Sequence, residues 1–283
     1  AQAASMRTRA DVVWLQQLEQ EAIADGVSPA TAHAALDNFL PDQRVIDFDQ
    51  KQPESTITFA DYRRRIVTPA RVRIGAELMR RYASELGAVS AQTGVPPQMI
   101  VALWGIESTY GRNSGDYETV NALATLAWQG RRADFFRKEL FAALHILDRE
   151  HMAPSQLRGS WAGAMGQCQF MPITYLRYAS DGDGDGRRDI WNDRADVFAS
   201  IANYLAVEGW RRGQSWGRPF DGARPEAAPS GGAQPQVVRP DGPDGAAFET
   251  FANFEALKRW NRSTYFALAA GLLADDIAAR ASS

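Results

Sequence analysis

The sequence predicts a mainly α-helical protein, and three observations support this fold class. Apolar residues recur at spacings of three and four over most of the 283 residues. Helix-start signals, of which Ser28-Pro29 and Pro96-Pro97 are the clearest, precede the periodic stretches. The composition is 45% apolar and 23% charged, typical of a globular protein, and the length suffices for about two lobes with a substantial core.

Composition and charge exclude several classes of protein. A formal net charge of −3 argues against a dedicated nucleic-acid binder, whose domains are usually basic. Cys168 stands alone, so neither an internal disulfide nor a cysteine-rich zinc site can form. The longest apolar stretch, Tyr265 to Ala274, is too short to span a membrane and is interpreted as a core helix.

The N-terminal third is predicted to be helical with one interruption. A first helix carries an apolar face and ends at Asp25-Gly26. A second begins at Ser28-Pro29 and ends near Leu40, after which residues 42–60 are expected to be extended or irregular. Seven arginines follow between Asp61 and Tyr82. They indicate either a solvated helix face or, less commonly, a rim for an anionic polymer.

Glu107 is the first candidate catalytic residue. The helix that starts at Pro96-Pro97 should end near Tyr110, with Gly111 as its cap. On this helix Glu107 shares a face with Leu103 and Trp104, and an apolar surrounding raises the pKa of a carboxyl group toward neutrality. Such a group can donate a proton to a leaving oxygen. The alternative is that Glu107 ends the helix and turns to water.

Further helices are expected around residues 136–147, 197–209 and 251–280. Between the last two, Gly and Pro supply 13 of the 33 residues from Gly213 to Gly245. This segment is predicted to be a linker or a small β-containing lobe, since its only β-like pair is Val237-Val238.

A glycine-rich stretch from Gly159 to Tyr175 carries aromatic and amide side chains among small residues. Small residues allow backbone to approach a ligand, while aromatic rings and amides suit the apolar faces and acetamido groups of sugars. A tight contact between two helices would explain the glycines equally well.

Two motifs together resemble the lytic murein transglycosylase B family. They are Trp104-Gly-Ile-Glu107-Ser and, about fifty residues later, Ser160-Trp-Ala-Gly-Ala-Met-Gly-Gln-Cys-Gln169-Phe-Met-Pro. Tyr62 in Asp61-Tyr-Arg-Arg-Arg, Ala202-Asn-Tyr204 and the closing Arg259-Trp-Asn261-Arg-Ser-Thr-Tyr265 are similar to further family motifs. The resemblance covers roughly residues 10 to 278, and departs from the family at Gln167-Cys168-Gln169.

The resemblance implies a goose-lysozyme-like α-helical core with a flanking helical lobe and a small β-containing lobe. It implies cleavage of the MurNAc–GlcNAc β-1,4 bond of peptidoglycan without water, leaving 1,6-anhydro-MurNAc ends. Glu107 would be the sole catalytic acid and base, and no cofactor would take part in the chemistry. The residues implied to line the glycan groove are Tyr62, Ser160, Gln169, Tyr204, Asn261 and Tyr265. Cys168 is interpreted as a buried small residue.

An aspartate run suggests a structural calcium site. Asp181, Asp183 and Asp185 occupy positions 1, 3 and 5 of an EF-hand-like loop, and hard oxygen ligands at alternate positions suit Ca²⁺. The pattern then departs from an EF-hand, so by the family resemblance Asp196 would close the loop at the start of the next helix. Arg187 would contribute only its backbone carbonyl. The alternative is a solvated Asp/Gly turn.

Two other functions stay open at this point. A muramidase would add water and yield a reducing end, although no second carboxylate stands in a recognisable partner motif. A non-catalytic, calcium-stabilised glycan-binding scaffold would tolerate Glu107→Gln without loss of function.

The expected organisation has three parts. Residues 1–66 and 250–283 would form the helical lobe, residues 67–210 the lysozyme-like core with the loop at 181–196, and residues 211–249 the linker or β-containing lobe. The implied setting is the periplasm, with outer-membrane association if the precursor carries a lipid anchor. The expected partners are peptidoglycan glycan strands, not nucleic acid. They could include cell-wall synthesis or remodelling proteins, and the chain is expected to be a monomer.

Overall fold

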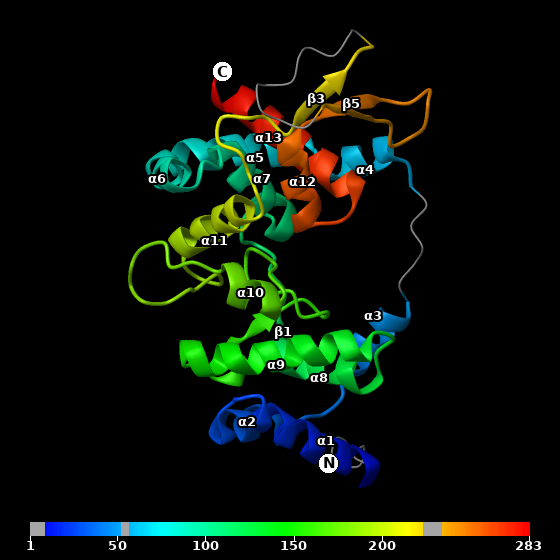
Figure 1. The fold of residues 1–283 in the computed structure, drawn as a ribbon, viewed down its shortest axis with the longest axis vertical. Coiled ribbons are helices and arrows are strands. Elements are labelled where there is room, and N and C mark those ends of the chain that lie inside the picture. Colours follow the sequence, from blue (N-terminus) through cyan, green and yellow to red (C-terminus); the bar gives the residue numbers. More distant parts are fainter. Residues whose placement is uncertain (1–8, 52–56, 223–233) are drawn as a thin grey trace. The chain divides into compact units, whose positions relative to one another are not determined.

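The computed structural model describes residues 9–51, 57–222 and 234–283 and is mainly α-helical (Figure 1). Its chain forms two compact units. Unit 1 contains Ala1–Glu54, Asn113–Arg177 and Gly186–Asn192, and unit 2 contains Ser55–Arg112, Tyr178–Asp185 and Asp193–Ser283. None of the helices in the described part of the chain has the length and apolarity that crossing a membrane requires.

Unit 1 is built on two long helices that pack against each other, α8 and α9 (Figure 1). Both bury leucines along one face, and the N-terminal helices α2 and α3 pack against them. A two-residue antiparallel ladder, β1 with β2, pairs Tyr117 with Gly159. The elements are α1 (Arg9–Ala24), α2 (Pro29–Leu36), α3 (Gln43–Gln50), β1 (Tyr117–Glu118), α8 (Thr119–Gln129), α9 (Ala133–Glu150), β2 (Arg158–Gly159) and α10 (Pro172–Tyr178), whose last residue lies at the unit boundary.

Unit 2 surrounds one buried helix, α7, which is apolar over most of its circumference, as a central helix must be. It packs against α5, α6, α11 and α13. The elements are α4 (Phe59–Ile66), α5 (Pro69–Arg81), α6 (Ala83–Thr93), α7 (Pro97–Ser108), α11 (Arg194–Val207), β3 (Gly217–Phe220), β4 (Gln236–Val238), β5 (Ala247–Thr250), α12 (Ala252–Trp260) and α13 (Thr264–Ala281).

The Gly/Pro-rich segment contributes the two outer strands of an antiparallel sheet in unit 2, ordered β3-β5-β4, and the central strand β5 follows it. Val237 and Val238 lie in β4 as expected, and every residue of the central strand β5 is buried. Residues 223–233 of the predicted linker lie outside the described residues. The division of the chain into a helical lobe, a core and a third lobe stays a prediction.

Several predicted helix boundaries are wrong, for local reasons. The second helix ends at Leu36 instead of Leu40. Residues 42–60 are not irregular throughout, because α3 starts after Asp42, whose side chain accepts a hydrogen bond from the Arg44 backbone N–H. The arginine-rich stretch is divided between α4 and α5 by Thr68 and Pro69, which start the second helix.

Candidate active site

The carboxyl group of Glu107 lies near the C-terminal end of α7 in unit 2 and is partly buried. The indole Nε1–H of Trp260 donates a hydrogen bond to its Oε1 at 2.7 Å. The same indole packs edge-on against Tyr204, with ring centroids 4.8 Å apart. Trp260 therefore holds one carboxyl oxygen of Glu107 in a fixed position.

Burial raises the pKa of Glu107 to about 7, and the Trp260 hydrogen bond opposes part of this rise. Burial disfavours the charged form, whereas a donor that faces the carboxylate favours it. In the described residues no neighbouring carboxylate is a cause of the shift. The expectation of a raised pKa is confirmed in direction, and such a group can exchange a proton in both directions near neutral pH.

The end of α7 is fixed by two consecutive residues in the left-handed region. Thr109 caps the helix with φ of 51°, and Tyr110 follows with φ of 58°, so the predicted cap at Gly111 is wrong. The Tyr110 ring turns back over Gly105, where a Cβ atom would come within 2.6 Å of it. The Tyr110 hydroxyl donates to the backbone carbonyl of Arg71 at 2.6 Å. These contacts tie the turn after Glu107 to α5.

Tyr62 and Tyr265 are brought together in unit 2, with ring centroids 5.7 Å apart. Tyr62 comes from α4 and Tyr265 from the first turn of α13, and both are partly buried. Burial raises the pKa of Tyr62, and the charge of Glu107 adds to this rise. Tyr62 therefore lies within electrostatic range of Glu107.

Tyr204 and Asn261 have side-chain oxygens already engaged with the protein. The Tyr204 hydroxyl donates to the carbonyl of Arg259 at 2.6 Å, and its ring supports Trp260. The Oδ1 atom of Asn261 accepts from the Ser263 backbone N–H at 2.9 Å. The Nδ2 group of Asn261 is thus the part of this side chain that can still donate to a ligand.

Ser160 and Gln169 belong to unit 1 and lie in a tightly folded loop between β2 and α10. The Ser160 Oγ accepts from the backbone N–H groups of Ala162 and Ala164, at 3.3 and 3.1 Å. The Gln169 Nε2 donates to the carbonyls of Ser114 and Gly166, both at 2.9 Å. Ser160 is left with a hydroxyl proton to donate, and Gln169 with an amide oxygen to accept.

The glycines of this loop are explained by contacts within the protein. A Cβ atom on Gly159 would lie 2.1 Å from the Ala164 carbonyl oxygen, and one on Gly163 would lie 2.4 Å from Leu123. The alternative of a tight contact between two helices is wrong, since Gly159 to Phe170 form turns and bridges and no helix. Cys168 is fully buried in this loop, as predicted.

The aspartate loop of unit 2 brings three carboxylates together. One oxygen each from Asp181, Asp183 and Asp185 lies within 4.8 Å of the others, and all three residues are exposed. Asp196, in the first turn of α11, is buried, and its Oδ1 accepts from the Gly182 backbone N–H at 2.6 Å. Arg187 belongs to unit 1. As ligands, these five residues stay predictions.

The residue missed by the sequence reasoning is Trp260. It lies inside the closing motif Arg259 to Tyr265, in which the sequence predicts only Asn261 and Tyr265 as groove residues. Its proximity to Glu107 joins residues 153 positions apart, so no periodicity can reveal it. The signal in the sequence that could have pointed to Trp260 is its position in the closing motif, directly before the candidate groove residue Asn261.

Comparison with known proteins identifies the family. The family model described as "Transglycosylase SLT domain" matches residues 10–275 of this chain. The chain is 34% identical over 242 residues to membrane-bound lytic murein transglycosylase B of Escherichia coli K12, covering 77% of this chain and 66% of that protein. The match thus spans slightly under two thirds of the length of that relative.

Solved structures agree with this similarity. SltB3 from Pseudomonas aeruginosa, in complex with NAG-anhNAM-pentapeptide, is 38% identical with a TM-score of 0.88, covering 94% of this chain and 78% of that one. Escherichia coli Slt35 in complex with calcium is 29% identical with a TM-score of 0.82, covering 95% and 94%. The predicted family resemblance and mainly α, lysozyme-like fold are confirmed. The chain belongs to the lytic murein transglycosylase family.

Proposed function

We propose that this chain cleaves the MurNAc–GlcNAc β-1,4 bond of peptidoglycan without water and leaves 1,6-anhydro-MurNAc ends. The observation that carries the proposal is Glu107, with a pKa raised to about 7 by burial and no carboxylate neighbour among the causes of the shift. Its relatives include lytic murein transglycosylases, one of them solved with a 1,6-anhydro-sugar fragment.

In the first step, protonated Glu107 donates its proton to the glycosidic oxygen, and the bond from that oxygen to C1 of MurNAc breaks. Without a second carboxylate, the 2-acetamido oxygen of the same sugar bonds to C1, as in substrate-assisted glycosidases. The donor proposed to orient the acetamido group is Asn261 Nδ2, the Ser160 hydroxyl or the Tyr62 hydroxyl.

In the second step, the Glu107 carboxylate takes the proton of the C6 hydroxyl. The O6 atom then attacks C1, the bond from C1 to the acetamido oxygen breaks, and Glu107 is protonated again for the next cycle. An intramolecular hydroxyl held close to C1 reaches an effective concentration of ~10⁵ M or more in well-oriented cases, which bulk water at ~55 M cannot match.

Digestion of purified peptidoglycan in ¹⁸O-water tests the reaction. We expect fragments one water lighter than hydrolysis products, with no label at the new MurNAc end. A reducing, labelled MurNAc end would show a muramidase instead. Binding without any product, unchanged in Glu107→Gln, would show a non-catalytic glycan-binding scaffold.

We also propose a structural calcium ion in the aspartate loop. The donors suit the ion, since one oxygen from each of three exposed carboxylates lies within 4.8 Å of the others and Ca²⁺ prefers six to eight oxygen ligands. Asp181, Asp183 and Asp185 would supply side-chain oxygens, Arg187 its carbonyl and Asp196 a late carboxylate. One relative, Slt35, has been solved with calcium. The ion would stabilise the fold and take no part in the reaction.

Tyr62, Ser160, Gln169, Tyr204, Asn261 and Tyr265 are proposed to line the glycan groove. Peptidoglycan is the proposed partner, because SltB3 binds peptidoglycan fragments in its solved complexes. The proposed setting is the periplasm, where that polymer is found, and the proposed state is a monomer. If the precursor carries a lipid anchor, the protein would associate with the outer membrane, and further partners would include cell-wall synthesis or remodelling proteins.

A further inference from the structure

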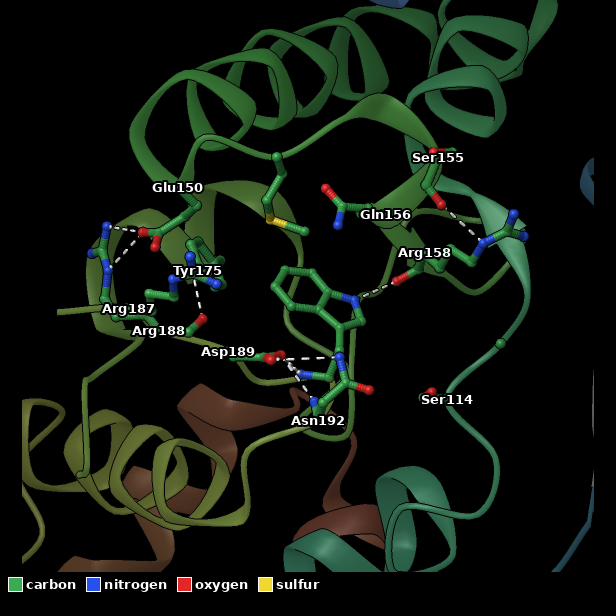
Figure 2. A pocket seen from close by; sticks show the side chains of 13 residues that line it. Ser114, Glu150, Ser155, Gln156, Arg158, Tyr175, Arg187, Arg188, Asp189 and Asn192 are labelled. Carbon is green, nitrogen blue, oxygen red and sulfur yellow. Dashed lines mark hydrogen bonds and ion pairs between the residues drawn. The ribbon is translucent and has the colours of Figure 1, made fainter. Parts of the chain in front are cut away.

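Unit 1 contains a cavity of about 410 Å³ for which the proposed mechanism has no use (Figure 2). It lies where the end of α9, the segment from Met152 to Arg158 and the segment from Arg187 to Asn192 meet. A volume of this order falls within the range of small-ligand sites. Figure 2 shows Gln156 reaching into the space between Glu150 and Arg158.

The cavity adjoins both groove candidates of unit 1. Ser114, which lines it, receives the hydrogen bond from the Gln169 Nε2 at 2.9 Å. Gly115, also in the lining, packs so closely on the Gly159 carbonyl that a Cβ atom would come within 2.2 Å. Ser160 follows Gly159 directly. A ligand in the cavity would therefore lie next to the loop that presents Ser160 and Gln169.

Most charged side chains of the lining form hydrogen bonds with one another or with backbone groups. Arg188 donates to Glu150 Oε1 from Nη2 at 2.5 Å and from Nε at 3.0 Å. Asp189 accepts from the backbone N–H groups of Trp191 and Asn192. Arg158 donates to the carbonyls of Ser155 and Asp116, at 3.0 and 2.7 Å. These bonds hold the charged side chains in place. Because the lining contains three arginines and two carboxylates, the ligand is inferred from its aromatic ring and its uncharged polar groups.

An aromatic ring and several free polar groups remain for a ligand. The Trp191 indole is partly buried, and its Nε1–H is committed to the Arg158 carbonyl at 2.7 Å. Tyr175 lies against the ring at 5.7 Å between centroids, so the indole is held in place. Gln156 Oε1 accepts from the Ala153 backbone N–H, which leaves its Nε2 group to donate. The hydroxyl of Ser114 and the Oδ1 atom of Asn192, whose Nδ2 group donates to Asp189 Oδ2 at 3.4 Å, add a further donor and acceptors.

We propose that this cavity is a subsite for an N-acetylated hexosamine of the glycan strand, with Trp191 as the stacking surface. The apolar face of a sugar ring matches an indole, and its hydroxyl and acetamido groups match Gln156 and Asn192. The proposal rests on the proposed function, since it takes peptidoglycan glycan as the ligand, and extends the groove beyond the Ser160–Gln169 loop.

The test is a titration followed by NMR of the tryptophan indole N–H signals in the Glu107→Gln variant, which does not consume its ligand. The probes are peptide-free GlcNAc–MurNAc oligomers and, separately, the isolated stem peptide. We expect the Trp191 signal, assigned by its loss in Trp191→Phe, to shift with the oligomers and not with the peptide. Trp191→Leu should weaken oligomer binding about tenfold, and Trp191→Phe, which keeps a ring, should largely retain it.

Trp128→Leu is the matched control, because Trp128 is a partly buried tryptophan of α8 outside the cavity lining. It should leave oligomer affinity unchanged. If Trp191→Leu does not fold, Asn192→Ala at an exposed position carries the test, with a loss of about threefold expected. Unchanged affinity in these variants, or a Trp191 shift with the stem peptide alone, overturns the proposal. Product analysis of the wild-type enzyme decides the proposed function independently of this titration.

Discussion

The Trp260 indole N–H and the Glu107 carboxyl oxygen, 2.7 Å apart, join the last motif of the sequence to the candidate catalytic acid. Because Trp260 stabilises the carboxylate, it holds the pKa of Glu107 lower than burial alone would. Burial raises the pH at which Glu107 changes between its protonated and charged forms, and Trp260 lowers it again in part.

The pH dependence of kcat/KM should report this relationship. In the proposed mechanism the reaction starts from protonated Glu107, so kcat/KM should fall as pH rises above about 7. Trp260→Phe removes the donor and should move this alkaline limb to higher pH, with a lower kcat. Trp210→Phe is the control, since the buried Trp210 indole N–H has no hydrogen-bond partner among the described residues, and this substitution should leave the limb in place. An unmoved limb in Trp260→Phe would contradict the role of Trp260.

Glu107→Gln should abolish turnover and stabilise the fold. General acid–base catalysis accelerates a step by a factor of ~10²–10⁴, and in the proposed mechanism both steps depend on this residue. Its folded-state pKa of about 7 exceeds the ordinary 4.5, so the wild-type fold loses stability as pH rises through this interval. Above pH 7 the neutral amide should raise the free energy of unfolding by about 3 kcal/mol. Urea unfolding at pH 5 and pH 8 checks this, and an equal gain at both would refute the buried-charge explanation.

Gly105→Ala should displace the turn that follows Glu107. The new methyl group would meet the Tyr110 ring at 2.6 Å, and overpacking of this kind costs about 1–3 kcal/mol. We expect a lower melting temperature and a lower kcat. Gly87→Ala in α6 is the matched control, because nothing lies within 4 Å of its Cβ position and alanine favours a helix. Equal effects of the two substitutions would show that the Tyr110 contact is unimportant.

Calcium should raise the melting temperature without being required for turnover. An ion that binds only the folded state stabilises it by mass action, and the three loop carboxylates repel one another without it. Asp183→Ala should remove the calcium-dependent rise, whereas Asp244→Ala, at an exposed position outside the loop, should keep it. Identical melting with calcium and with chelator would favour a solvated turn.

Local signals in the sequence predict much of the fold. The cap at Ser28 is observed, with its Oγ accepting from the Thr31 N–H, because capping depends on residues three apart. The helix α3 was missed because its polar sequence hides a short apolar face around Val45 and Ile46. The break between α12 and α13 was missed because Asn261 and Ser263 end and cap helices through side-chain bonds that periodicity does not register.

The candidate site was predictable only where a motif carried it. Glu107 stands on an apolar helix within a family motif, so both its position and the direction of its pKa shift could be foreseen. Trp260 could not be placed, since its contact depends on how α12 packs in unit 2. The sequence does not predict the cavity beside Trp191 either, because its lining comes from four separate stretches of the chain that only the fold brings together.

The two hydrogen bonds that Gln169 donates to backbone carbonyls have a consequence for selectivity. With both Nε2 hydrogen bonds formed, the amide cannot rotate to exchange its oxygen and nitrogen. Its oxygen can therefore accept hydrogen bonds only from N–H and O–H groups of a ligand. The Ser160 oxygen already accepts from the backbone N–H groups of Ala162 and Ala164. Its hydroxyl can therefore only donate to a ligand, to a carbonyl or ether oxygen. A secondary amide presents one group of each kind. We therefore expect this loop to discriminate the 2-acetamido group from a plain 2-hydroxyl, and de-N-acetylated glycan to be a poorer ligand.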